Sequence, residues 1–144
     1  MDNKINWMAI LASVVATMVI GFLWYGAIFQ NQWMAGNGIT AYEDSTIMYK
    51  NGAEMDMSFT PMIVNIIFMF IYAFIMNWLL NKLNARNLQS GAMVGLAVGV
   101  THLMNIMVGN MFAANPSSLT MVDGSYSIVL FTVMGAILGA MQKR

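Results

Sequence analysis

Residues 91–112 read GAMVGLAVGVTHLMNIMVGNMF, an apolar run that contains no Lys, Arg, Asp or Glu. A helix that crosses a bilayer needs roughly 20 predominantly apolar residues, and this run is long enough. Three further uncharged apolar runs lie at residues 5–29, 60–80 and 124–141. The sequence therefore predicts an all-α integral membrane protein, in which residues 1–144 form one domain built as a four-transmembrane-helix bundle.

The overall composition agrees with this prediction and excludes several other classes of protein. Hydrophobic residues make up 59% of the chain and charged residues only 8%, against about 25% charged in an ordinary soluble domain. The net charge is 0, so no excess of positive charge is available to bind a nucleic-acid backbone. With 0 Cys and 1 His, the sequence offers no thiolate chemistry and few metal ligands, and we expect no cofactor.

One face of the third run is small and polar. At about 100° per residue, the following positions fall within about 80° of one another: Gly91, Gly95, Gly99, His102 and Gly109. The fourth run has a weaker stripe formed by Gly135 and Gly139. Small residues spaced by four let two helices approach closely in a membrane. We expect these glycines to form packing faces, within the monomer or between copies.

Polar side chains within the predicted spans are the candidate functional residues, and they are Asn65, Tyr72, His102 and Asn105. His102 lies near the middle of its span, where a charged group is costly and a polar group requires a partner. Tyr72 lies at a similar depth in the second run. We expect the Tyr72 hydroxyl group to contact a neutral His102, with Asn105 nearby, and this contact to hold two helices together. A water-lined site that handles protons is the alternative.

Charged residues between the runs predict the orientation of the helices, because cytoplasmic loops collect Lys and Arg. Basic residues follow the second run and end the chain: Lys82, Arg86, Lys143 and Arg144. The loop at residues 30–59 is mainly acidic, with one Lys50 against Glu43, Asp44, Glu54 and Asp56. We therefore expect both termini in the cytoplasm, the long loop outside, and a location in the bacterial inner membrane.

The outer loop also contains a helix-start signal. Thr40 and Glu43 have the spacing of a capping box, in which the two side chains satisfy free N–H groups at the start of a helix. Asn51 and Gly52 would end such a helix. The sequence therefore predicts a short helix in this loop, beginning at Thr40.

Catalysis and metal binding are not expected. Asp123 marks the outer boundary of the fourth span, so no acidic residue lies beside His102, and Ser125 and Ser127 lie near the outer surface. A Ser, His and Asp arrangement would have to join the surface to the middle of the membrane, so we expect no catalytic residues. The 17 Met residues raise the alternative of a Cu(I) site. The Met side chains of the third run point away from His102, so we expect no metal site.

Residues 6–34 resemble a known family. The pattern consists of Asn6 and Trp7, GFLWYG at residues 21–26, and then Phe29, Trp33 and Met34. With the Gly-rich third run and GAILG at residues 135–139, it resembles the uncharacterised family of small membrane proteins called domain of unknown function 1761. The resemblance covers essentially the whole chain. It implies a four-span membrane protein and no particular activity.

Two functions follow as expectations. The glycine faces favour a non-enzymatic protein that acts in the lipid bilayer as a homo-oligomer, or as an accessory subunit bound to other membrane protein subunits. The alternative is a channel or transporter for a small solute or proton, lined by His102, Tyr72 and Asn105. A polar stripe that faces water favours transport, whereas a stripe buried against a helix favours packing.

Overall fold

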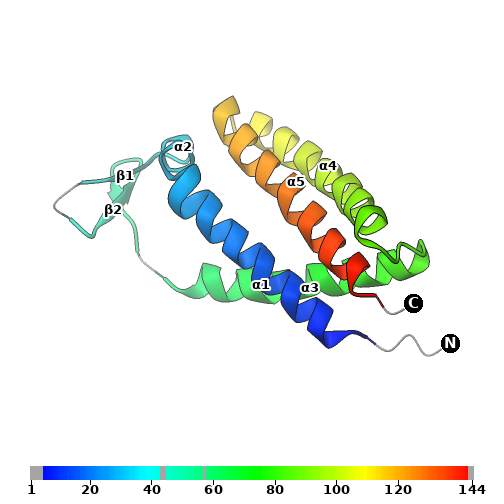
Figure 1. The fold of residues 1–144 in the computed structure, drawn as a ribbon. Coiled ribbons are helices and arrows are strands. Elements are labelled where there is room, and N and C mark those ends of the chain that lie inside the picture. Colours follow the sequence, from blue (N-terminus) through cyan, green and yellow to red (C-terminus); the bar gives the residue numbers. More distant parts are fainter. Residues whose placement is uncertain (1–4, 43–44, 57, 143–144) are drawn as a thin grey trace.

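Four long apolar helices dominate the computed structural model, which describes residues 5–42, 45–56 and 58–142 (Figure 1). The first consists of α1 (Trp7–Leu23) and a π-helical turn, η1 (Trp24–Ile28). The others are α3 (Thr60–Lys82), α4 (Leu88–Phe112) and α5 (Ser117–Ala140). All 4 are long and apolar enough to cross a membrane, as the sequence predicts.

The helix boundaries follow from capping residues and tight turns. The side chain of Asn6 accepts a hydrogen bond from the Ala9 N–H at the start of α1, and that of Asn87 accepts one from the Ser90 N–H at the start of α4. Between α4 and α5 the chain turns at Ala114, which has a φ of 54°, and at the extended Pro116. α5 begins directly after this proline. The predicted start of the fourth span, at residue 124, is therefore about two turns too late.

The predicted loop helix at Thr40 is wrong. Thr40 lies in strand β1 (Ile39–Ala41), opposite Tyr49 of β2 (Met48–Lys50), and β3 (Ala53–Glu54) completes a three-stranded antiparallel sheet. Asn51 and Gly52 have φ values of 51° and 85°, which is the backbone of a tight hairpin turn between β2 and β3. The other half of the capping box, Glu43, lies outside the described residues, as does Asp44.

A short helix, α2 (Gln30–Gly36), does lie in the segment between the first two spans, but it directly follows η1. The backbone turns two residues after the end of α2, at Gly38. The φ of Gly38 is 65°, which favours glycine because a Cβ atom is strained there. The sheet follows, so α2, β1, β2 and β3 form a small cap at one end of the bundle (Figure 1).

α5 is the central helix of the bundle. It packs along α4 and also contacts α1 and α3, whereas α3 and α4 scarcely touch each other. α1 and α5 run in opposite directions, since the Asn6 side chain donates a hydrogen bond of 2.7 Å to the Met141 carbonyl oxygen. The two ends of the described chain therefore lie at one end of the bundle (Figure 1). The largest buried side chains include Ile10, Leu80, Met134 and Leu138.

The predicted glycine faces lie mostly within the monomer. A Cβ atom on Gly91 would collide with the carbonyl oxygen of Gly135, and one on Gly139 would lie 2.6 Å from the carbonyl oxygen of Asn87. Backbone contact of this kind requires glycine, and it recurs along the α4–α5 interface at Gly95 and Gly99. Gly109 differs, because a Cβ atom there would meet nothing within 4 Å, so it lies outside this interface.

Candidate functional site

A cavity of about 320 Å³ lies between α3 and α4, over α5 and beside η1. Its polar lining comes from four elements: Tyr25, Asn65, Tyr72, His102, Asp123, Tyr126 and Ser127. The rest of the lining is apolar: Met69, Ile106, Leu130 and Phe131. We call this space the Asp123 cavity. Its volume is within the range of roughly 300–1,000 Å³ that is typical of small-molecule sites.

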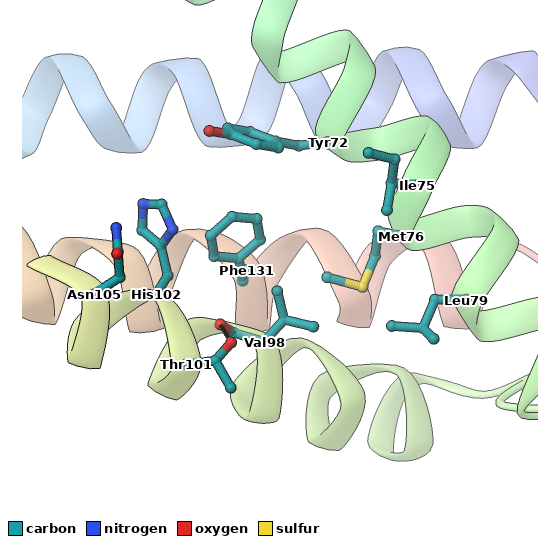
Figure 2. A pocket seen from close by; sticks show the side chains of 9 residues that line it. All are labelled: Tyr72, Ile75, Met76, Leu79, Val98, Thr101, His102, Asn105 and Phe131. Atoms are coloured by element: carbon teal, nitrogen blue, oxygen red, sulfur yellow. Dashed lines mark hydrogen bonds between the residues drawn. The ribbon is translucent and has the colours of Figure 1, made fainter.

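A second pocket of about 310 Å³ adjoins the Asp123 cavity, and the two share Tyr72, His102 and Phe131. Figure 2 shows this second pocket, whose far end is lined by Ile75, Leu79 and other apolar side chains. The Asp123 cavity is the more polar of the two, and the second pocket is the more apolar. The shared residue His102 lies near the middle of α4, and its ring packs against that of Phe131.

The π-helical turn η1 places two aromatic side chains against α5. In this turn the Phe29 N–H donates to the Trp24 carbonyl oxygen at 2.8 Å, five residues back along the chain. The Trp24 indole N–H donates to the Val122 carbonyl oxygen at 3.1 Å, and the Tyr25 hydroxyl donates to Oδ1 of Asp123 at 3.0 Å. Single π-helical turns are rare and frequently lie at functional sites. The aromatic block at residues 21–26 therefore ends in a turn that contributes to the cavity.

Asp123 and His102 line the same cavity, so the prediction that no acidic residue lies beside His102 is wrong. The physical reason is the early start of α5 at Ser117. This start carries Asp123 well into the helix, where its side chain is half-buried and accepts the bond from Tyr25.

Ser127 is also deeper than the sequence analysis placed it, and it lines the same cavity as His102. Its side chain is only 2% exposed, and its hydroxyl group donates to the carbonyl oxygens of Gly124 (2.7 Å) and Gly99 (3.3 Å). Within the described part of the chain, no hydrogen bond joins Ser127, His102 and Asp123 as a catalytic triad requires. The predicted separation in depth between Ser127 and His102 is therefore wrong, and the absence of catalysis stays a prediction.

The predicted contact between Tyr72 and His102 takes a different form. Both rings pack against Phe131 in an edge-to-face manner, with ring centroids 5.3 Å and 5.5 Å from that of Phe131. No hydrogen bond joins Tyr72 to His102 in the described residues, and Figure 2 shows both side chains beside the shared pocket. Asn105 lines the second pocket next to His102, and Asn65 lines the Asp123 cavity. The structure therefore gathers the four predicted polar residues around two pockets that share Tyr72, His102 and Phe131.

Among the described residues, the Asp123 cavity has an acidic side chain but no Lys or Arg, and several of its polar side chains make no hydrogen bond. No Lys or Arg of the described residues lines it, because Lys82 lies at the opposite end of α3 and Arg86 follows that end. The side chains of Asn65, Tyr72, His102 and Tyr126 make no hydrogen bond to other described residues. Asn65 is exposed and the other three side chains are partly buried, so their polar groups are open to water or to a bound solute. Within the described ranges, no three His, Cys, Asp or Glu side chains group as metal ligands.

Three important lining residues, Tyr25, Asp123 and Tyr126, are absent from the predicted site. The signal for Tyr25 lies in the aromatic block at residues 21–26, and the signal for the other two lies in Pro116. A proline favours the first turn of a helix and disfavours a helical residue before it, so it indicates that the fourth span begins there.

Comparison with known proteins identifies the family. No curated protein and no solved structure matches this chain. Residues 8–139 match the family described as "Protein of unknown function (DUF1761)", in agreement with the resemblance seen in the sequence. The chain is therefore a member of the DUF1761 family.

Proposed function

We propose that the protein is a non-enzymatic integral membrane transporter whose Asp123 cavity holds a small polar solute or a proton. The observation that supports this proposal best is the convergence of Asn65, Tyr72, His102 and Asp123 on one cavity between long apolar helices. In hydrocarbon such polar side chains are costly, and they typically mark solute or proton pathways.

The proposed location is the bacterial inner membrane, with both termini in the cytoplasm. Two features support this orientation. Asn6 and Met141 lie at one end of the bundle, and Lys82 at the end of α3 and Arg86 just after it are the basic residues of the described α3–α4 connection. Cytoplasmic connections carry such residues. The sheet then lies outside the cell.

Self-association through glycine faces has less support than transport. Self-association through these faces requires glycines that are free to meet a helix of another subunit. Gly91, Gly95 and Gly135 already contact backbone within the monomer. An assembly with a second copy or another subunit therefore stays a separate hypothesis. Native mass spectrometry of gently extracted protein tests it, since a closed homo-oligomer or a reproducible second polypeptide would support it and a bare monomer would contradict it.

Flux through purified protein tests the transport proposal. Proteoliposomes that contain a pH-sensitive dye receive an imposed proton gradient, with and without amines, amino acids, sugars or carboxylates outside. We expect the wild-type protein to change the internal pH faster than protein-free liposomes. We expect Asp123→Asn and His102→Ala to lower this rate by about tenfold or more, because both line the cavity.

The matched control is Asp56→Asn, which removes an exposed carboxylate of the loop, and it keeps the wild-type rate. Equal rates in wild-type, protein-free and Asp123→Asn liposomes with every solute would contradict the transport proposal.

A further inference from the structure

We propose that the Asp123 cavity binds a monovalent organic cation, namely a protonated amine with a small apolar or aromatic body. This inference rests on the proposed function and specifies the class of solute. Asp123 supplies the counter-charge, the tyrosine side chains form the walls, and the adjoining pocket takes the apolar body.

The charge of the lining favours a cation. Among the described residues, Asp123 is the one carboxylate that lines the cavity, and no Lys or Arg lies there to neutralise it. One carboxylate oxygen accepts the Tyr25 hydroxyl group, which leaves the other available. A carboxylate between apolar helices requires a proton or a positive partner, because an uncompensated charge is costly there. A ligand with one positive charge satisfies this requirement.

The walls of the cavity favour an organic body over a bare ion. The rings of Tyr25, Tyr72, Tyr126 and Phe131 line it, and those of Tyr25 and Tyr126 pack edge to face with centroids 4.8 Å apart. Aromatic rings attract ammonium groups through their negative faces. Beyond Tyr72 and His102, the second pocket adds apolar contacts from Ile75, Met76, Leu79 and Val98. An amine head and an apolar body therefore match the Asp123 cavity and the second pocket in turn.

A hard metal ion fits this lining less well. Calcium requires six or more oxygen ligands and magnesium requires octahedral geometry, whereas this cavity offers one carboxylate. A primary ammonium group has three N–H donors and needs three acceptors. Asp123 provides one acceptor, and the Asn65 carbonyl oxygen and the Tyr72 and Tyr126 hydroxyl oxygens provide further ones in the same lining.

A charge series of matched probes tests the inference. The probes are 2-phenylethylammonium, neutral 2-phenylethanol and anionic 3-phenylpropanoate, which share a ring and a short linker. Each is titrated calorimetrically at neutral pH into wild-type protein in lipid nanodiscs, with empty nanodiscs as the blank for partition into lipid. We expect the cation to bind about tenfold or more tightly than either analogue, since only the cation pairs with Asp123.

Variants assign the preference to a residue. Asp123→Asn preserves the shape of the side chain and removes its charge, so we expect it to abolish the preference for the cation. Asp56→Asn, in the loop, keeps the preference. If Asp123→Asn fails to fold, the charge series on the wild-type protein decides by itself.

The outcomes separate this inference from the proposed function. Equal binding of the cation and the alcohol, or a preference that survives in Asp123→Asn, would overturn the cation inference. In that case solute-dependent flux that is lost in His102→Ala still supports the transporter. No binding of any probe together with no protein-dependent flux would contradict both.

Discussion

Tyr25 donates a hydrogen bond of 3.0 Å from its hydroxyl group to Oδ1 of Asp123, and this bond joins the end of the first span to the fourth span. It holds the carboxylate at the edge of the cavity, next to the rings of Tyr25 and Tyr126. The arrangement depends on the π-helical turn at Trp24–Ile28, which directs successive aromatic side chains toward α5.

Loss of the Tyr25 hydroxyl group tests the energetic importance of this bond. We expect Tyr25→Phe to lower the free energy of unfolding by roughly 1–3 kcal/mol, as for a hydrogen bond to a charged group. Reversible unfolding in mixed micelles measures the change. The control is Tyr42→Phe, since Tyr42 is 65% exposed beside the sheet. Equal losses in the two variants would contradict a specific role for the Tyr25 bond.

The glycine contacts between α4 and α5 predict opposite effects for two similar substitutions. Gly95→Ala places a methyl group against the Phe131 carbonyl oxygen, so we expect a loss of roughly 1–3 kcal/mol or more in unfolding free energy. Gly109→Ala on the same helix meets open space. It leaves stability unchanged or raises it by up to about 1 kcal/mol, because Ala favours a helix more than Gly. Similar losses at both positions would show that the interface is misplaced.

The hairpin between β2 and β3 depends on Gly52, whose φ is 85°. A β-branched side chain is strained in this conformation, so we expect Gly52→Val to destabilise the sheet by roughly 1–2 kcal/mol. Limited proteolysis of the loop measures the effect, and faster cleavage is the expected result. Asn51→Gly, at the neighbouring turn position, keeps the wild-type cleavage rate. Because the sheet lies at the end of the bundle, unfolding of the helices should not change.

Binding of the cation depends on pH because a proton and the ligand compete for Asp123. The titratable groups that line the cavity with Asp123 are Tyr25 from η1, Tyr72 from α3, His102 from α4 and Tyr126 from α5 itself. At low pH the carboxyl group of Asp123 is protonated and no longer attracts a cation, so affinity falls. At higher pH affinity rises until Asp123 is fully ionised. Calorimetry across pH measures this, and a flat profile in Asp123→Asn with a rising profile in wild type is the expected result.

The four apolar helices are predictable from sequence because each run comes close to or exceeds the roughly 20 residues that cross a bilayer and contains no charge. The start of α5 was missed because Asp123 and Gly124 resemble a boundary. Asp123 instead lies inside the helix, since Tyr25 and the cavity provide a polar environment for its side chain. Pro116 marks where α5 begins, but a single run does not encode the contact with Tyr25 that accommodates Asp123 inside the helix.

The fold of the loop and the lining of the cavity also depend on contacts between residues that are distant in the sequence. Asn51 and Gly52 are equally suited to end a helix or to form a hairpin turn, and pairing of Thr40 with Tyr49 decides for the hairpin. His102 and Tyr72 were recognisable from their depth in the spans. Their shared neighbour Phe131 was not, because its position depends on how closely the glycines of α4 let α5 approach.

The reactivity of single cysteines toward charged thiol reagents tests directly whether the Asp123 cavity admits water and favours a cation. The chain has 0 Cys, so Ile106→Cys in the cavity and Met104→Cys on the outer face of α4 each introduce one thiol at similar depth. A water-filled cavity permits thiolate formation, whereas lipid does not. We expect cationic aminoethyl methanethiosulfonate to modify Ile106→Cys faster than the anionic sulfonatoethyl reagent does, and to modify Met104→Cys slowly. Equal, slow modification of both cysteines would contradict a solute-accessible cavity between the helices.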